Sequence, residues 1–75
     1  MFERVKNLLV DKLNIDAELI TPEAELEKDL GINSLDVYEL VVGCEEEFDV
    51  EIADEDARSF ITVADIVKFL EEKAS

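Results

Sequence analysis

The sequence predicts an all-α fold: a small four-helix bundle of three main helices and one short helix, in a single domain over residues 1–75. Apolar residues recur at three- and four-residue intervals in three separate segments, the spacing that gives a helix one buried face. Apolar residues make up 48% of the chain, which is enough to fill a core despite the net charge of −14. The short alternating run at Val50 and Ile52 has no second run to pair with, so no sheet is expected.

The first main helix is expected over Phe2–Leu13, whose apolar residues repeat with helical spacing, and Asn14 is expected to end it. A long connection over residues 15–33 follows. Within it, Thr21 and Pro22 suit the cap and first residue of a helix of a single short turn. Four apolar residues of the connection are expected to hold it against the core: Leu19, Ile20, Leu26 and Leu30.

The second main helix is expected to start at Asn33 or Ser34 and to run to about Phe48, with Asp36 completing a start that resembles a capping box. On a helical wheel its apolar residues form two stripes. The first is the expected core face and comprises Val37, Leu40, Val41, Cys44 and Phe48. The second is expected to be apolar surface and comprises Leu35, Tyr38 and Val42.

The sequence pattern of the last third of the chain predicts a short helix followed by a long helix. A helical turn is expected over Asp54–Arg58, and a final helix follows the capping-box-like sequence from Thr62 to Asp65 and ends near Lys73. Between these helices lie two further core candidates, Phe60 and Ile61.

The composition of the chain reduces the number of functional classes to be considered. Twenty-one acids against seven bases exclude a nucleic-acid backbone as the main ligand, because such a contact needs clustered Lys and Arg. From Asp29 to Ala57 there are eleven acids and no Lys or Arg, which favours basic protein partners. The chain contains no His and no catalytic constellation, so an enzyme is the least favoured class and no catalytic residue is assigned.

The expected location is the cytoplasm. One cysteine cannot form an internal disulfide, so a reducing compartment is the default. No secretory leader or long apolar span is visible, so no membrane association is expected. A mature chain whose leader has been removed is the alternative, and we expect a monomer in either case.

Ser34 is the candidate functional residue. It stands at the expected start of the second helix, where the positive end of the helix dipole favours a bound phosphate. A serine in this position is most often a helix cap. Its acidic surroundings favour instead a hydroxyl that another protein modifies.

The sequence Asp29-Leu-Gly-Ile-Asn-Ser-Leu-Asp36 resembles the attachment motif of acyl carrier proteins, and Glu39–Phe48 resembles their second helix. The similarity continues through Asp49–Asp56 and Thr62–Glu72. It implies an acyl-carrier-protein-like bundle with 4′-phosphopantetheine joined to Ser34 through a phosphodiester. The thiol of this group carries acyl chains as thioesters, most often in fatty acid biosynthesis. A phosphopantetheinyl transferase attaches the group and supplies the base and the metal.

The resemblance also implies a partner surface on the second helix. Basic-surfaced synthases and acyltransferases are its expected partners, and its expected residues are Leu35, Asp36, Tyr38, Glu39, Val42, Glu45 and Glu46. The chain departs from the family at Asn33, where Asp is usual. Asn caps a helix about as well, but it removes a charge that contacts the transferase. Departures at Tyr38, Val42 and Cys44 leave the preferred acyl length open.

Two other functions remain open. One is a discrete carrier for polyketide, lipid-modification or aminoacyl transfer, with the same fold and the same serine. The other is an acidic interaction module without a prosthetic group. Asp54, Asp56 and Arg58 lack the pattern of an EF-hand, and no metal site is assigned. Weak divalent-cation binding is left open at two groups of acids: Asp29 with Asp36, and Glu47 with Asp49 and Asp54.

Overall fold

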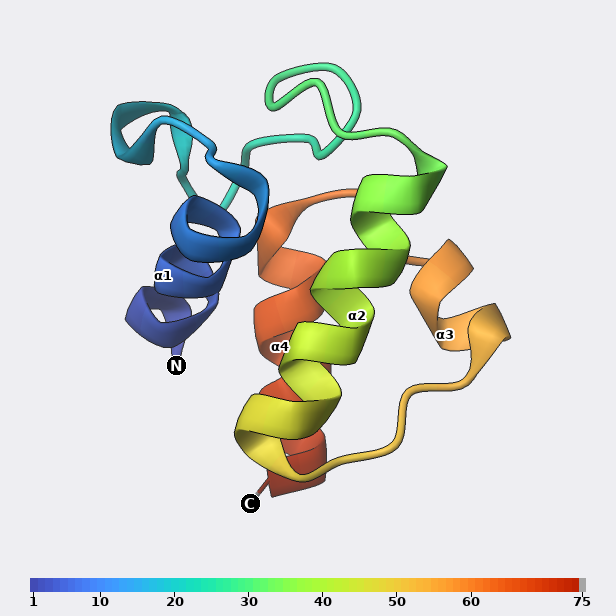
Figure 1. Ribbon diagram of the computed structural model, residues 1–75. Helices are drawn as coiled ribbons and strands as arrows, with labels where there is room; N and C mark the ends of the chain where they lie inside the picture. Colours follow the sequence, from blue (N-terminus) through green and yellow to red (C-terminus); the bar gives the residue numbers. More distant parts are fainter. Residues whose placement is uncertain (75) are drawn as a thin grey trace.

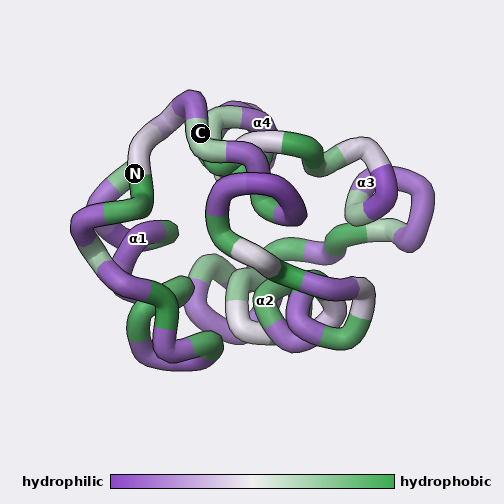
Figure 2. The backbone as a smooth tube through the Cα atoms, turned by 90° about the horizontal axis from the view of Figure 1, so that it is seen from above, coloured by the Kyte–Doolittle hydropathy of each residue, from purple (hydrophilic) through white to green (hydrophobic). Residues whose placement is uncertain are grey.

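The computed structural model describes residues 1–74. Over this range the elements are α1 (Phe2–Leu13), the 3₁₀ turn η1 (Ala17–Leu19), α2 (Ser34–Phe48), α3 (Asp54–Arg58) and α4 (Val63–Ala74). The short α3 lies on the opposite side of α2 from α1 (Figures 1 and 2). The predicted all-α bundle of three main helices and one short helix is confirmed. No helix over these residues is long and apolar enough to span a bilayer.

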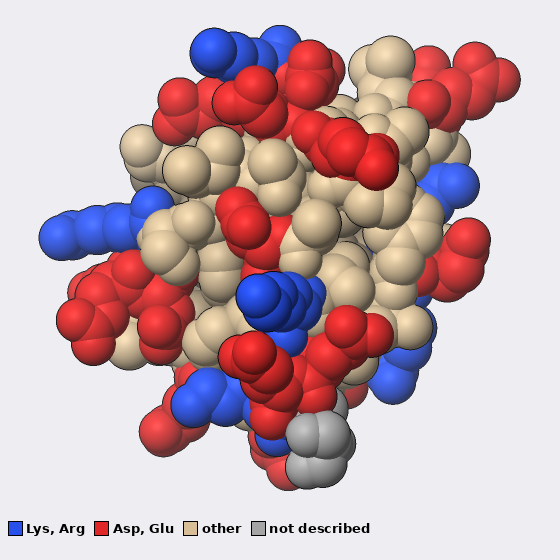
Figure 3. Space-filling view, turned by 180° about the vertical axis from the view of Figure 1, so that it is seen from behind, with Lys and Arg blue, Asp and Glu red and all other residues tan. Residues whose placement is uncertain are grey.

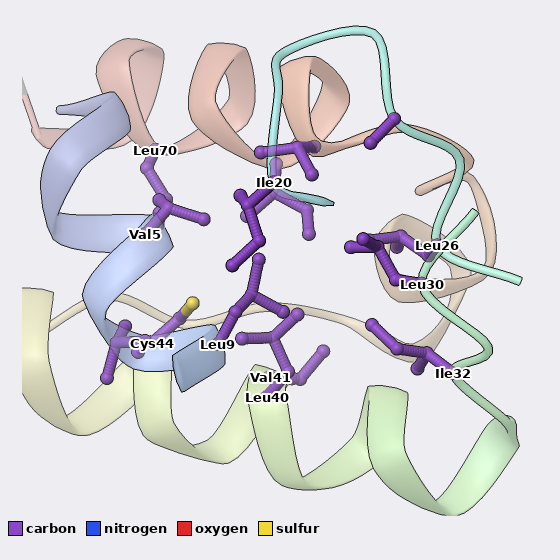
Figure 4. Close-up of a cluster of buried hydrophobic side chains, with 14 of the residues drawn as sticks. Val5, Leu9, Ile20, Leu26, Leu30, Ile32, Leu40, Val41, Cys44 and Leu70 are labelled. Carbon is purple, nitrogen blue, oxygen red and sulfur yellow. The ribbon is translucent and has the colours of Figure 1, made fainter. Parts of the chain in front are cut away.

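The core is shared by the three long helices and by the connection between α1 and α2. Figure 4 shows Leu9 of α1, Leu40 of α2 and Ile20 of the connection pointing toward a common centre. Val5, Leu9 and Leu70 are fully buried, each with 0% exposure. Burial of apolar side chains of this size contributes roughly 1.5–3 kcal/mol each, so this cluster supplies most of the drive to fold.

Helix α1 forms where predicted, and Asn14 ends it as expected. Asn14 adopts the left-handed conformation, with φ 59°, and its N–H donates to the carbonyl of Val10 at 3.0 Å. Asn tolerates this conformation better than most residues, so it satisfies a carbonyl at the helix end at little cost.

The helix predicted to start at Thr21 and Pro22 is limited to one hydrogen-bonded turn, in which the N–H of Ala24 donates to the carbonyl of Thr21 at 3.1 Å. In the described connection the helical turn is η1, which Asp16 caps by accepting the N–H of Glu18 at 2.9 Å. The carbonyl of Pro22 instead accepts the N–H of Ala64 in α4, at 2.9 Å. A carbonyl that bonds a distant helix is not free for a local one, so this tertiary contact overrides the local signal.

The connection is bonded to the start of α4 by backbone groups. The N–H of Leu26 donates to the carbonyl of Ile61 at 2.9 Å, and the N–H of Val63 donates to the carbonyl of Ala24 at 3.1 Å. Glu25 and Thr62 form an isolated antiparallel bridge between them. The first N–H groups of α4, which have no partner inside the helix, are thus satisfied by the connection.

Two predicted core residues lie at the surface. Leu19 is 53% exposed and Ile61 is 61% exposed, so both predictions are wrong. At Ile61 the backbone, rather than the side chain, is held in place: its N–H donates to the carboxylate of Asp65 at 2.9 Å, and its carbonyl accepts the N–H of Leu26 at 2.9 Å. The other predicted pins, Ile20, Leu26 and Leu30, are buried. Phe60 is half-buried and packs edge-on against Phe69, with ring centroids 5.5 Å apart.

The capping box predicted for α4 is confirmed. The N–H of Thr62 donates to the carboxylate of Asp65 at 3.0 Å, and the N–H of Asp65 donates to the hydroxyl oxygen of Thr62 at 3.3 Å. The hydrogen bonds from the backbone of Thr62, and then of Ile61, lower the pKa of Asp65. The helix runs to Ala74, close to the predicted end at Lys73.

Candidate functional site around Ser34

Ser34 is the first residue of α2, but it does not cap the helix. The cap is Asn33, whose side-chain oxygen accepts the N–H of Asp36 at 2.9 Å, while the Asp36 carboxylate accepts the N–H of Asn33 at 3.3 Å. Ser34 is exposed, and its hydroxyl makes no hydrogen bond to the part of the chain that the structure describes. The structural role most common for a serine at this place is therefore taken by its neighbour.

The turn before Ser34 is fixed by backbone geometry. Gly31 has φ +66° and no atom within 4 Å of the position of a Cβ, so glycine is required by the conformation of the backbone and not by lack of space. Leu30 and Ile32, on either side of it, are both buried. The N–H of Ile32 also donates to the carbonyl of Leu26 at 2.8 Å. These contacts hold the start of α2 in one place.

A groove of about 740 Å³ lies between α2 and α3 and opens to solvent. Ser34 lines it at the N-terminal end of α2, and Glu45 lines it about three turns further along. Apolar and polar groups both contribute to its wall. The lining residues are Glu27, Ser34, Val37, Tyr38, Val41, Val42, Glu45, Ile52, Asp54, Ala57, Arg58 and Phe60.

The groove-lining residues of α3 and its flanks were not predicted as site residues. Ile52, Ala57 and Phe60 form one wall. The sequence marked Phe60 only as core, Ala57 only as part of a short helix and Ile52 only as part of a short alternating run. Arg58 is the one basic side chain among the groove-lining residues. A five-residue helix has too little periodic pattern to show which way it faces, so only the apolar character of Ile52 and Phe60 was a usable signal.

The residues predicted as a partner surface fall on two adjacent sides of α2. Leu35, Glu39, Val42 and Glu46 follow one another at three- and four-residue spacing and so share one side. Leu35 is 76% exposed, and Glu39 and Glu46 are exposed, while Val42 is half-buried. Tyr38, at 66% exposure, lies on the groove side with Ser34.

Glu45 and Asp36 differ from the other acids predicted for this surface. Both are half-buried, and the carboxylate of each accepts a backbone hydrogen bond. Glu45 accepts the N–H of Ile52 at 3.0 Å. These two side chains therefore support the fold around the site, whatever else they contact.

The segment of sequence that contains α2 has no basic residue of its own, although Arg58 lines the groove beside it and Arg4 pairs with Glu47. Residues 29–57 contain no Lys or Arg. On the face opposite to that of Figure 1, which Figure 3 shows, the Lys and Arg side chains are scattered among acids and form no continuous patch. This distribution suits a partner with a basic surface.

Cys44 is a buried hydrophobic residue and not a nucleophile. It is 1% exposed, and in Figure 4 its sulfur points from α2 into the core beside α1. Burial, with a smaller contribution from the charge of Glu45, raises the pKa of the thiol to about 12. The reactive thiolate is therefore disfavoured at neutral pH.

The acids left open as cation sites are not gathered into one. Among the described residues no three His, Cys, Asp or Glu side chains come together in a way that could hold a metal ion. The carboxylates of Asp29 and Asp36 accept the backbone N–H groups of Glu25 and Asn33, at 2.7 Å and 3.3 Å. Each of the two thus already has a structural role.

The geometry fits the attachment of 4′-phosphopantetheine. Such attachment requires an accessible hydroxyl, and Ser34 is exposed and unbonded to the described chain. The N–H groups of the first turn of a helix lack internal partners and favour a nearby phosphate. A groove lined in part by apolar side chains begins at the same residue.

Comparison with known proteins agrees with this geometry. A family model described as the phosphopantetheine attachment site matches residues 3–70. The acyl carrier protein of Helicobacter pylori strain J99 is 47% identical over 72 residues, which is 96% of this chain and 92% of that protein. The acyl carrier protein of strain 26695 is 50% identical over the same shares of both chains. The chain therefore belongs to the acyl carrier proteins, the carriers whose cofactor is 4′-phosphopantetheine.

Proposed function

We propose that Ser34 is the attachment residue and that the protein, as a single carrier domain, carries acyl intermediates of fatty acid biosynthesis in the cytoplasm. The observation that supports this most directly is the exposed Ser34 hydroxyl, free of any capping bond, at the end of the groove between α2 and α3. The group, once bound, supplies a thiol that holds an acyl chain as a thioester.

The chain's own contribution to the attachment is a hydroxyl in a fixed position. Asn33 and Asp36 hold the helix start, and Gly31 sets the turn that leads into it. No His is present in the chain, so the base that removes the Ser34 proton belongs to the transferase. This protein thus supplies the hydroxyl and the transferase supplies the base, as expected for a carrier that does not itself catalyse the reaction.

The groove is the proposed shelter for the acyl chain. Its apolar wall includes Val37, Val41 and Phe60, so an alkyl chain that enters it leaves water. A volume of about 740 Å³ falls within the usual range of ligand sites, roughly 300–1,000 Å³. The exposed Leu35, Glu39 and Glu46 beside it are the proposed contacts for the transferase and for basic synthases and acyltransferases.

Incubation with coenzyme A and a broad-specificity phosphopantetheinyl transferase tests this proposal. Intact mass should show the gain of one phosphopantetheine in the unsubstituted protein and none in Ser34→Ala. Ser59→Ala is the matched control, because Ser59 is also exposed but its hydroxyl donates to the carbonyl of Asp56 at 2.7 Å. A gain in Ser34→Ala would refute the assignment.

The cargo requires a second measurement. The intact mass of protein purified from its native cells identifies the acyl group on the arm. A fully saturated acyl chain supports the fatty acid pathway. An aminoacyl or polyketide group would assign the protein to another carrier pathway, and an unmodified chain would favour an interaction module.

A further inference from the structure

Glu45 is bonded to the segment that leads into α3. One of its carboxylate oxygens accepts the N–H of Ile52 at 3.0 Å, across seven residues of sequence. Its backbone carbonyl accepts the N–H of Val50 at 3.3 Å. Its neighbours Glu46 and Glu47 are exposed, whereas Glu45 is half-buried. This acid is therefore part of the structure that places α3.

The short α3 is also held by the packing of Ala57 and Phe60 against the core. The helix has five residues, none of them buried, and its N-cap Ala53 offers no side-chain hydrogen bond. Hydrogen bonds to a charged group contribute about 1.5–3 kcal/mol. Ile52 is 8% exposed, so its N–H, without Glu45, would lose its partner in a place that water reaches poorly.

The Glu45–Ile52 hydrogen bond lies at the end of the groove far from Ser34. Both of its residues line the groove, and Glu45 is about three turns along α2 from the attachment residue. An acyl chain that starts on the Ser34 side therefore reaches this hydrogen bond only when it is long enough to fill the groove.

We infer that Glu45 is a specificity-determining residue that limits the length of the acyl chain that the groove holds; the inference rests on the proposed function of the groove. While the bond to Ile52 is intact, the segment before α3 closes the far end. A longer chain can enter fully only if the segment moves and the bond breaks. Long chains therefore bind with a penalty that shorter chains avoid.

Three variants test the inference. Glu45→Ala removes the acceptor, Glu45→Gln keeps an oxygen at the same place without the charge, and Glu46→Ala is a matched control with the same loss of charge. In the unprimed proteins, amide hydrogen exchange at Ile52 should be about tenfold faster, or more, in Glu45→Ala. It should be intermediate in Glu45→Gln and unchanged in Glu46→Ala. Circular dichroism checks that each variant is folded.

The second readout is the melting temperature of each variant loaded with saturated acyl chains of increasing length. The unsubstituted protein and Glu46→Ala should be stabilised most by the same intermediate length. In Glu45→Ala the maximum should move to longer chains, with Glu45→Gln in between. Equal Ile52 exchange in Glu45→Ala and Glu46→Ala, or an unmoved maximum, would refute the role of Glu45. Absence of stabilisation by any chain in the unsubstituted protein would refute both this role and the groove's proposed function.

Discussion

Arg4 of α1 and Glu47 of α2 form an ion pair, with a guanidinium nitrogen 3.2 Å from a carboxylate oxygen. Both side chains are about half exposed, at 56% and 51%, and exposed pairs contribute only about 0.2–1 kcal/mol. Arg4 also lies over the ring of Phe48, 4.5 Å from its centroid. A weak attraction of this kind offsets little of a net charge of −14, so repulsion dominates the surface electrostatics.

The melting temperature is expected to rise with sodium chloride. Salt screens exposed charges over about 10 Å at 0.1 M and so weakens the repulsion among the acids. Millimolar magnesium or calcium should raise it further, because divalent cations prefer carboxylate oxygens and the acids are closer together in the folded state than in the unfolded chain. Scanning calorimetry at matched ionic strength separates screening from binding. A melting temperature that stays flat across all three salts would show that the acids are too widely spaced to matter.

Substitution of Asn33 should separate folding from priming. Asn33→Asp keeps the cap, so the free energy of unfolding should change by less than about 0.5 kcal/mol, whereas Asn33→Ala should lose about 1 kcal/mol. The added charge in Asn33→Asp should speed modification by a transferase that contacts Asp in other carriers. Denaturant melts and initial rates of priming measure the two effects. Equal priming rates for the unsubstituted protein and the Asn33→Asp variant would show that a charge at this position does not affect modification.

Charge reversal on the exposed flank of α2 should weaken partner binding. Glu39→Lys and Glu46→Lys should lower the association rate with a carrier-dependent synthase, and the loss should shrink at high salt. Glu3→Lys on α1 makes the same change of charge elsewhere and serves as the control. Surface plasmon resonance at two salt concentrations gives the rates. A loss that does not depend on salt would indicate misfolding or an apolar contact.

The buried thiol of Cys44 should make stability fall at alkaline pH. Burial, and then the charge of Glu45, raise its pKa from 9.0 to about 12. As the pH rises, the thiol ionises in the unfolded protein before it ionises in the folded protein. The contribution of Cys44 to the free energy of unfolding is therefore complete below about pH 9 and is lost as the pH rises toward about 12. The unfolding free energy should therefore decrease more between about pH 8 and about pH 10.5 in the unsubstituted protein than in Cys44→Val. Equal decreases would place the thiol in contact with water.

The sequence predicted the elements whose signals are local. Asn33 and Asp36 lie three residues apart and satisfy each other, so the start of α2 follows from sequence alone. Asn14 and the box at Thr62 and Asp65 marked two more helix ends correctly. Ser34 could be singled out because its motif and the acids around it are contiguous.

Features that depend on distant contacts could not be predicted. Pro22 has the local sequence of a helix start. No residue near it in sequence indicates that its carbonyl accepts a hydrogen bond from the N–H of Ala64. Leu19 and Ile61 were expected inside on apolar character alone, although their backbones decide which way they face. The groove lies between α2 and α3, and the packing of α3 combines apolar contacts with the core and a hydrogen bond between residues seven apart.

The hydrogen bonds between residues 22–26 and 61–64 also impose an order of events on synthesis. A nascent chain that ends before Ile61 already contains Ser34, but the N–H of Leu26 has no carbonyl to bond. The turn before Ser34 depends on Leu26 in its place, because Ile32 bonds the carbonyl of that residue. Ser34 is therefore expected to reach its final position only after α4 has left the ribosome. If Ser34 is the attachment residue, chains that already contain a folded α4 should be modified in preference to shorter nascent chains.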